Sequence, residues 1–303
     1  MSAFPIYTLR IASVTPIKSI YYRLEFALTW IFLRLIRLFP FAMRIKIGGA
    51  VLGFVISNLP QSKARIDINL RNIFPDMDAN ERREITKEVG RTFGKSIIET
   101  LNGADYVKQQ QLFHASGPGL QALHDAIDAG KGFILISSHF GQSDAVRHYL
   151  KGQGIEVGAV YRPHNNPYFS QLFQNEISHS GTPTFPKGRR GTMNLVKHLR
   201  QGGYVSILLD QKYSKGKNIK FLGHKVFTSI APAQMALKYD IPMIPVYGTR
   251  RKGSADIDIE FEAPIPHSTP KRMTRLANKS LSKRVRATPG QWYWLHQRWN
   301  FED

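Results

Sequence analysis

The residues best suited to chemistry lie in one short block, SHFGQSD, at positions 138–144. This block directly follows an apolar run, Phe133 to Ser137, whose composition predicts a buried strand. Active groups of open α/β sheets gather at the carboxyl ends of strands, so we expect His139 at such an end. Gly141 permits a tight turn there. The helix expected from about Ser143 to Lys151 would then direct its N-terminal N–H groups at a developing anion.

A histidine and an aspartate can approach each other across this turn, because Asp144 follows His139 by five positions. The carboxylate would accept a hydrogen bond from one imidazole nitrogen, which fixes the tautomer and makes the other nitrogen a general base. An imidazole pKa of about 6.5 suits removal of a proton from a hydroxyl near neutral pH. The same spacing is also common in purely structural pairs. The sequence has no Cys and no G-x-S-x-G motif, so we expect direct attack by an acceptor hydroxyl.

Two further polar residues directly follow predicted strands. Arg162 follows the predicted strand Glu156 to Tyr161, where its planar guanidinium could hold a phosphate or stabilise an oxyanion. The alternative for Arg162 is a surface ion pair. Asp210 follows the predicted strand Val205 to Leu209 and could support Arg162 or the acceptor, or simply cap the strand. Both residues therefore join His139 in the candidate catalytic set.

A basic, glycine-containing loop, Pro186 to Gly191, supplies the candidate contacts to substrate. Its cationic residues Lys187, Arg189 and Arg190 suit a phosphorylated sugar headgroup, although a solvated loop has the same composition. Gln211, next to Asp210, could add a hydrogen bond. Together with Gly141, these residues form the predicted substrate-binding set.

Two other groups of residues carry no chemical pattern of their own. The scattered histidines have no spacing of metal ligands, so no metal is expected; they are His114, His124, His148, His164 and His296. The Trp and Tyr residues between positions 292 and 299 recur every three or four positions, which predicts core packing.

The elements that must position these residues alternate along the chain. Residues 61–110 look helical, with a turn at Pro75-Asp76 and Asp78 as the N-cap of the second part. From Gly130 onward, short apolar strands alternate with helical patterns: helices are expected at 168–180, 192–201 and 230–239, and strands at 243–247 and 257–261. This alternation predicts an α/β fold with a mixed, mostly parallel sheet flanked by helices.

The N-terminal part has a different texture. The first 20 residues lack the pattern of a signal peptide. The stretch Leu24 to Met43 is apolar and aromatic, and on a helix Arg23, Arg34 and Arg37 would fall within about 60° of one another. An apolar helix with one basic stripe lies in the headgroup plane more readily than it crosses a bilayer.

Pro40 should end or kink this helix, and a second uncharged run, Ile47 to Leu59, suits a re-entrant or buried segment. An interfacial anchor is therefore favoured over a transmembrane helix or an ordinary core helix. We predict a membrane-anchor segment at 1–60 and a catalytic domain at 61–303.

The charge balance indicates an anionic partner. Lys and Arg total 42 against 22 Asp and Glu, a formal net charge of +20. Six Lys and no acid lie between Asp210 and Asp240, and eight Lys or Arg and no acid lie between Glu262 and Glu302. Nucleic acid, anionic lipid and an acidic carrier protein all fit this charge. No zinc finger, RNP motif or basic-leucine pattern appears, and a nucleic-acid protein has no use for the apolar N-terminus.

In their order and spacing, several motifs resemble the bacterial lipid A biosynthesis acyltransferases of the lysophospholipid acyltransferase superfamily. The motifs are NLRNIFP at 69–75 with Glu81-Arg82, SHFG at 138–141, YRP at 161–163, FPKGRRG at 185–191, Asp210-Gln211, FLG at 221–223, Pro242 to Pro245 and WYWLH at 292–296. The resemblance implies transfer of an acyl chain from acyl carrier protein to a hydroxyl of a lipid A precursor, without a cofactor, at the cytoplasmic face of the inner membrane. It also implies that His139 is the base and Asp144 its orienting partner.

One position departs from that family, whose members usually carry Glu at the acidic position and often Trp before it. Here Asp144 follows Ser143, as in the glycerolipid branch of the superfamily. This departure keeps a second acceptor class open: a lysophospholipid, lyso-ornithine lipid or other glycolipid. A catalytically silent membrane-surface protein on the same fold is the non-enzyme alternative.

Overall fold

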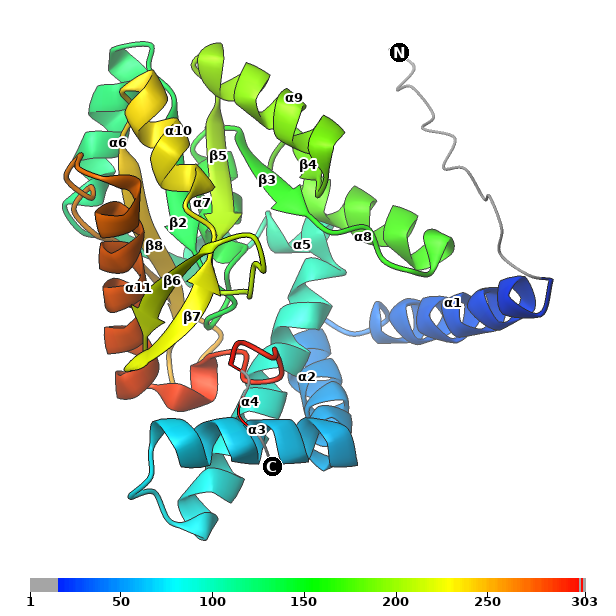
Figure 1. The fold of residues 1–303 in the computed structure, drawn as a ribbon. Helices are drawn as coiled ribbons and strands as arrows, with labels where there is room; N and C mark the ends of the chain where they lie inside the picture. Colours follow the sequence, from blue (N-terminus) through cyan, green and yellow to red (C-terminus); the bar gives the residue numbers. More distant parts are fainter. Residues whose placement is uncertain (1–15, 300, 302–303) are drawn as a thin grey trace, which may run out of the picture.

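The computed structural model describes residues 16–299 and Phe301. Most of the first 20 residues, in which the sequence showed no signal peptide, therefore lie outside the described part of the chain. The described part folds around one large sheet with helices on both faces and a group of N-terminal helices beside it (Figure 1).

The sheet has seven strands in the order β1-β9-β8-β2-β5-β3-β4. Neighbouring strands are parallel except for the antiparallel pair β8–β9. The strands are β1 (Phe113–Ser116), β2 (Phe133–Ser137), β3 (Val157–Tyr161), β4 (Thr184–Pro186), β5 (Tyr204–Leu208), β8 (Met243–Arg250) and β9 (Ile257–Phe261). The predicted mixed, mostly parallel sheet is thus confirmed.

The central strand β2 shows why both faces need helices, since all five of its residues are buried. Ile134 and Ile136 pack on one face against α9 (Arg189–Arg200), α10 (Ala231–Tyr239) and α11 (Pro270–Ala287). Phe133 and Leu135 point to the other face, against α6 (Gly119–Asp128) and α7 (Ala145–Gly152). Successive side chains of a strand point to opposite faces, so an unbroken apolar run fits only a sheet covered on both sides.

A separate two-stranded hairpin, β6 (Lys217–Phe221) and β7 (His224–Thr228), crosses in front of the large sheet (Figure 1). Its turn contains Leu222 with φ 50° and Gly223 with φ 96°, the left-handed pair that tight hairpins require. Ile219, Phe221 and Val226 are buried under it, while alternate residues face solvent. The sequence reading assigned no strand here.

The N-terminal apolar region forms two helices rather than one. These are α1 (Pro16–Ile36) and α2 (Phe41–Asn58), separated at Pro40, where the helical pattern was expected to end. They are followed by α3 (Pro60–Ile73) and α4 (Ala79–Thr100), and Asp78 caps α4 by accepting hydrogen bonds from the N–H groups of Asn80 and Glu81. The predicted N-cap is therefore confirmed.

Helix α2 packs closely against α4 through glycines. Gly53 lies so near α4 that an added Cβ would stand 2.9 Å from the backbone of Arg91. In the opposite direction, a Cβ on Gly90 would stand 2.5 Å from the carbonyl oxygen of Gly53. Such close backbone approach ties α2 to the helix that borders the sheet.

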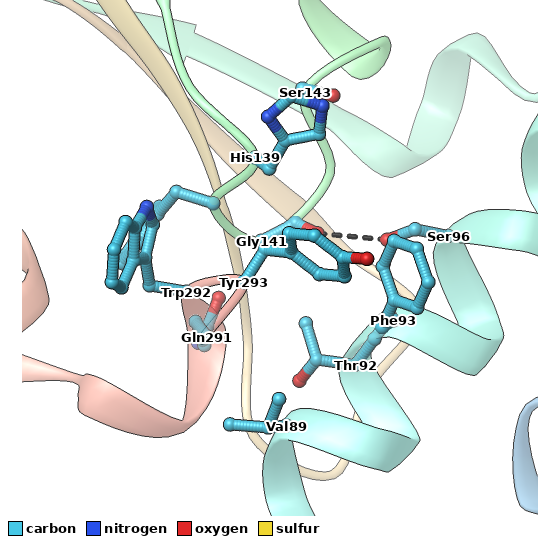
Figure 2. A pocket seen from close by; sticks show the side chains of 11 residues that line it. Val89, Thr92, Phe93, Ser96, His139, Gly141, Ser143, Gln291, Trp292 and Tyr293 are labelled. Atoms are coloured by element: carbon cyan, nitrogen blue, oxygen red, sulfur yellow. Dashed lines mark hydrogen bonds between the residues drawn. The ribbon is translucent and has the colours of Figure 1, made fainter. Parts of the chain in front are cut away.

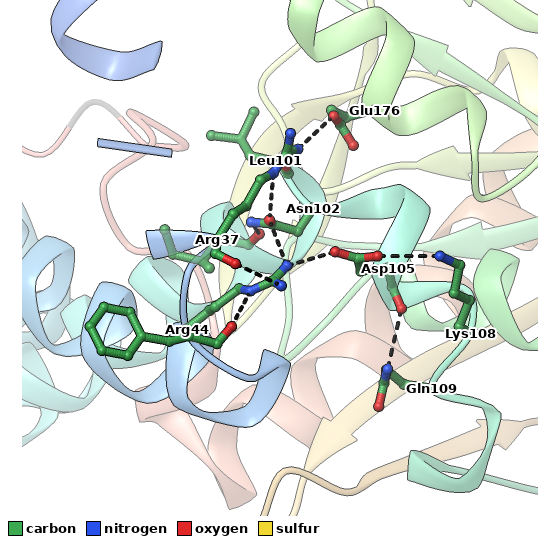
Figure 3. A network of polar contacts seen from close by, with 10 residues as sticks. Arg37, Arg44, Leu101, Asn102, Asp105, Lys108, Gln109 and Glu176 are labelled. Carbon is green, nitrogen blue, oxygen red and sulfur yellow. Dashed lines mark hydrogen bonds and ion pairs between the residues drawn. The ribbon is translucent and has the colours of Figure 1, made fainter. Parts of the chain in front are cut away.

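Helix α1 lies beside α8 (Pro167–Ser178) and extends away from the sheet (Figure 1). The Arg23 Nε donates to the hydroxyl of Tyr168 at 3.0 Å. At the other end, Arg37 donates to Glu176 of α8 at 3.0 Å, and Arg44 forms an ion pair with Asp105 at 2.6 Å (Figure 3). The predicted headgroup stripe is thus corrected for two of its three arginines: Arg23 and Arg37 bond to the protein, because α8 supplies a hydroxyl and a carboxylate within reach. Arg34 stays exposed, over the ring of Trp30 on the same helix.

The outward face of α1 is apolar instead. Seven of its eight exposed large apolar residues fall within an arc of about 100° when successive residues are turned by 100°, and Trp30 lies outside that arc; the seven are Ile17, Ile20, Tyr21, Leu24, Leu28, Ile31 and Leu35. Within residues 16–299, α2 is the one helix whose length and composition would allow it to cross a membrane. Exposed apolar patches of this extent mark interaction surfaces.

Candidate functional site

Four parallel strands bring the predicted site residues to one edge of the sheet. Strands β2, β5, β3 and β4 are consecutive neighbours and run in the same direction, so their carboxyl ends lie side by side. His139 follows β2, Asp210 follows β5, Arg162 follows β3 and Lys187 follows β4. Residues up to 71 positions apart along the chain therefore come to the edge where open α/β sheets bind ligands.

At this edge, His139 pairs with Asp210. The imidazole Nδ1 and the Asp210 Oδ1 are 3.0 Å apart, and the other carboxylate oxygen accepts the backbone N–H of His139 at 3.1 Å. The Asp210 side chain is 2% exposed and that of His139 27% exposed. A buried carboxylate at Nδ1 fixes the proton there and leaves Nε2 as the nitrogen able to take a proton.

The same carboxylate adjusts the charge of the imidazole. Burial by itself would lower the pKa of His139, but the negative charge of Asp210 and its hydrogen bond outweigh burial and hold that pKa above its ordinary value. Burial likewise favours the neutral form of Asp210, yet His139 keeps the pKa of this carboxyl below its usual range. The pair therefore stabilises the imidazolium that forms when Nε2 accepts a proton.

The expected pairing of His139 with Asp144 is corrected by this geometry. The Asp144 carboxylate accepts a hydrogen bond from Thr100 at 3.3 Å and lies 3.6 Å from the guanidinium of Arg147. The reason is the left-handed turn at Gly141, φ 55°, after which the chain is held towards α4 instead of folding back on the imidazole. Asp144 still contributes at longer range, since its charge also raises the pKa of His139.

A buried polar network holds the segment after His139. Glu99 of α4, 3% exposed, accepts from the side-chain amide of Gln142 at 2.6 Å and from Arg250 at 2.8 Å. Arg250 also donates to Ser96 at 2.9 Å, and the Ser96 hydroxyl donates to the carbonyl of Gly141 at 2.9 Å. Through these bonds α4 and β8 fix the turn that carries the imidazole.

Gly141 itself is fully engaged within the protein. Its N–H donates to the carbonyl of Gln291 at 2.7 Å, and its carbonyl accepts from Ser96. An added Cβ would stand 2.0 Å from the carbonyl oxygen of Gly248, so only glycine fits. Gly141 thus shapes the turn, and it also lines the cavity beside His139. Its contact with substrate stays a prediction.

The predicted basic residues stand at the ends of the next two strands. Arg162 is exposed and forms no hydrogen bond or ion pair with residues 16–299. The backbone N–H of Lys187 donates to the carbonyl of Tyr161 at 2.7 Å, which holds the two strand ends together. Lys187, Arg189 and Arg190 are exposed. The suggested contact of Asp210 with Arg162 is absent from the described residues, because the Asp210 carboxylate is already used by His139 and Trp292.

The late aromatic segment belongs partly to the site, which the sequence reading missed. Trp292, Trp294 and Trp299 pack in one buried cluster, as expected. In addition, the indole N–H of Trp292 donates to Asp210 at 3.0 Å, and the backbone N–H of Tyr293 donates to the carbonyl of His139 at 3.0 Å. The Tyr293 ring lies 5.8 Å from the imidazole. No local pattern marks these roles, which arise only when residues 82 and 154 positions apart meet.

The residues next to Asp210 make structural contacts. The side chain of Gln211 is exposed, and its carbonyl accepts from Arg298 at 2.7 Å. His296 accepts the backbone N–H of Lys212 at 2.8 Å, a structural role next to Asp210. In the part of the chain that the structure describes, no group of three or more His, Cys, Asp or Glu side chains could hold a metal ion.

A small, mainly apolar cavity of about 40 Å³ opens beside His139 (Figure 2). Val89 and Phe93 of α4 form one wall, and Phe140, Trp292 and Tyr293 form much of the rest. Its size admits a few water molecules or the end of a hydrocarbon chain, not a whole lipid. An apolar wall beside an imidazole is the environment in which a hydrocarbon group and a polar reaction centre can lie together.

The fold and site thus define an α/β protein with a histidine–carboxylate pair at the carboxyl edge of its sheet, next to exposed cations and an apolar N-terminal surface. The sequence profile of the bacterial lipid A biosynthesis acyltransferases matches residues 17–300. The chain belongs to this family, and it is an acyltransferase of lipid A biosynthesis.

Individual relatives agree over most of the chain. A lipid A biosynthesis acyltransferase of Haemophilus influenzae is 22% identical over 88% of this chain and 84% of its own length. The lipid A biosynthesis lauroyltransferase of Escherichia coli K12 is 22% identical over 89% and 90%, respectively. The palmitoleoyltransferase of the same organism is 25% identical over 76% of each chain. The relatives are named for different acyl chains, so similarity alone does not set the chain that is transferred.

Proposed function

We propose that this protein transfers a fatty acyl chain from acyl carrier protein to a hydroxyl of a lipid A precursor, with His139 as general base. The observation that carries the proposal is the His139–Asp210 pair, which leaves the imidazole Nε2 as the proton acceptor at the carboxyl edge of the sheet. Family membership supports acyl transfer in lipid A biosynthesis.

The reaction follows from this geometry. The acceptor hydroxyl gives its proton to Nε2 as its oxygen attacks the thioester carbonyl, and the imidazolium formed is stabilised by Asp210. Collapse of the tetrahedral intermediate breaks the carbon–sulfur bond, and the imidazolium returns the proton to the departing thiolate. The exposed guanidinium of Arg162, at the neighbouring strand end, is our candidate for stabilising the oxyanion.

The acceptor headgroup is assigned to the segment that follows β4. The sequence predicted a loop here over Pro186 to Gly191, but α9 already begins at Arg189, so only Lys187 and Gly188 connect the strand to the helix. Lys187, Arg189 and Arg190 are exposed, beside the strand end that carries Arg162. Arginine and lysine bind phosphate through charge-assisted hydrogen bonds, and lipid A precursors present phosphates on a sugar core. This segment would hold the headgroup while the apolar cavity receives hydrocarbon.

We assign the protein to the cytoplasmic face of the inner membrane, anchored through residues 1–60. The apolar face of α1 and the composition of α2 support this location. Helix α1 is fixed to α8, whose first residues directly follow the Arg162 loop. A membrane in contact with α1 would thus lie beside the proposed site.

A competition assay tests the acceptor. Acyl carrier protein that bears a radiolabelled acyl chain would be supplied to the purified protein together with a lipid A precursor and a lysophospholipid. We expect label on the disaccharide precursor. The Asp144 departure from the family favours the lysolipid as the second candidate, so label on the lysolipid alone would overturn our assignment.

The base is tested by His139→Ala, with His164→Ala as the matched histidine control. We expect the first change to reduce transfer by roughly 10²–10⁴-fold, while His164 is exposed, has no contact with the pair and should tolerate removal. Membrane binding and melting temperature should match the unchanged protein. Near-normal turnover of His139→Ala would refute the mechanism.

A further inference from the structure

A second cavity lies against the hairpin, next to the segment that follows Asp210. Its volume is about 280 Å³, and its lining includes Lys212, Asn218, His224, Lys225, Arg298 and Trp299. It is separate from the cavity beside His139, with which it shares no lining residue. Two of its three charged lining residues, Lys212 and Lys225, come from a stretch, residues 211–239, that contains no Asp or Glu.

The most informative lining residue is Arg298, which is 1% exposed. Its terminal nitrogens donate only to neutral oxygens: the carbonyls of Gln211 and Phe227, and the hydroxyl of Thr228. Within the described residues it forms no ion pair, and its Nε is buried without a hydrogen-bond partner. Burial lowers the pKa of Arg298 to about 10, and the charge of Asp210, which acts in the opposite direction, offsets only part of this effect. A buried guanidinium without an ion-pair partner is costly unless a further anion approaches it.

Two other features in and beside the cavity also lack a partner that an anion could supply. The indole Nε1 of Trp299, a residue 5% exposed, is also buried without a partner among the described residues. On the hairpin, Lys220 and Lys225 stand directly opposite each other in the ladder. Like charges in this position destabilise a β-pair, and a bound anion would relieve the repulsion. Donors and positive charge therefore converge on one space.

We propose that this cavity binds a phosphate ester, with Lys225, Arg298 and Trp299 facing the anion. Arg298 donates to the carbonyl of Gln211, the residue after Asp210, so the bound phosphate would lie close to the catalytic pair. Two substrates of the proposed reaction carry such a group: the acceptor headgroup and the prosthetic arm of the carrier. The choice between them rests on the proposed function, whereas phosphate binding itself does not.

Calorimetric titration with inorganic phosphate at constant ionic strength tests the site on the full-length protein in detergent. We expect saturable binding that Lys225→Ala weakens about tenfold, the effect of removing one charge-assisted bond. Lys197→Ala is the matched control, because Lys197 is exposed on α9, which runs from the β4 end back to the opposite edge of the sheet. A change at buried Arg298 could unfold the chain. The second variant is therefore Asn218→Ala, at an exposed residue that lines the same cavity, and its phosphate affinity is measured in the same way. Absence of phosphate binding, or equal affinity in Lys225→Ala, overturns the proposal.

Steady-state kinetics distinguish the two sources of phosphate. If the headgroup occupies the cavity, Lys225→Ala raises KM for the acceptor and inorganic phosphate competes with it. If the prosthetic arm occupies the cavity, Lys225→Ala raises KM for the donor, and inorganic phosphate competes with the donor. A protein that binds phosphate but transfers no acyl chain would refute the proposed function and leave this site intact.

Discussion

At the scale of single residues, Asp210 determines what His139 can do. It is one of two carboxylates near the imidazole, and it alone forms the hydrogen bond to Nδ1 in the described structure. Its second oxygen accepts from two N–H donors, those of His139 and Trp292. An amide at this position would turn an NH₂ group towards at least one donor, leaving buried groups unpaired at about 1–3 kcal/mol.

We therefore expect Asp210→Asn to reduce turnover by roughly 10²–10⁴-fold, and Asp144→Asn to reduce it by less than about tenfold. The two variants are matched in chemistry and differ only in which carboxylate they neutralise. Rates of acyl transfer at saturating donor check the ranking. A larger loss for Asp144→Asn would reinstate that residue as the partner.

The pH profile provides a second residue-scale prediction. Only the neutral imidazole accepts a proton, so activity should rise with pH through the pKa of His139. Asp210 and Asp144 hold this pKa above its ordinary value. Neutralising Asp144 removes negative charge, so its variant should show an acid limb shifted to lower pH while retaining most of its maximal rate. An acid limb unmoved by Asp144→Asn would contradict the electrostatic contribution of that residue.

At the scale of elements, the packing of α2 on α4 links the N-terminal region to the site. Glu99 and Ser96 of α4 hold the turn after His139, and Gly53 of α2 contacts the same helix near Arg91. A side chain at position 53 would push α4, and the displacement would reach the turn that carries the imidazole.

Gly53→Ala should therefore destabilise the protein by about 1–3 kcal/mol, although alanine is the better helix former by about 1 kcal/mol. The expected change is a lower melting temperature in detergent. Val51→Ala, on the exposed side of the same helix, is the control and should leave the melting temperature nearly unchanged. Stabilisation by Gly53→Ala would show that α4 can move away without cost.

Elements with strong patterns could be predicted from sequence, and others could not. The uninterrupted apolar run at β2 and the N-cap at Asp78 have local causes, so their places were predictable. The hairpin was missed because lysines alternate with its buried residues and dilute the apolar signal. The site follows the same division: the position of His139 follows from one strand, whereas its pairing with Asp210 depends on β2 and β5 being neighbours.

At the scale of the whole molecule, one side of the protein is apolar and the rest is strongly basic. The apolar side is formed by α1 and the exposed positions of α2, including Leu28 at 71% and Phe54 at 71% exposed. The formal net charge is +20. Apolar insertion and attraction to anionic headgroups would therefore act together in binding a bilayer.

Leu28→Asp should weaken binding to vesicles containing anionic lipid by at least about tenfold, because a buried leucine contributes about 1.5–3 kcal/mol. Met193→Asp is the matched control: Met193 is 62% exposed but lies on α9, away from α1. Vesicle sedimentation measures both. Equal losses in the two variants would mean that α1 has no special part in the contact.

The bond from Trp292 to Asp210 has a consequence for the order in which the protein matures. During synthesis, α1 and α2 leave the ribosome first, whereas Trp292 follows every strand of the sheet. The hydrophobic helices are thus available to a bilayer while the pocket still lacks its last wall. If the proposed membrane contact and mechanism hold, the nascent chain would reach the bilayer before its active site is complete, and acyl transfer would require that translation has passed Trp292.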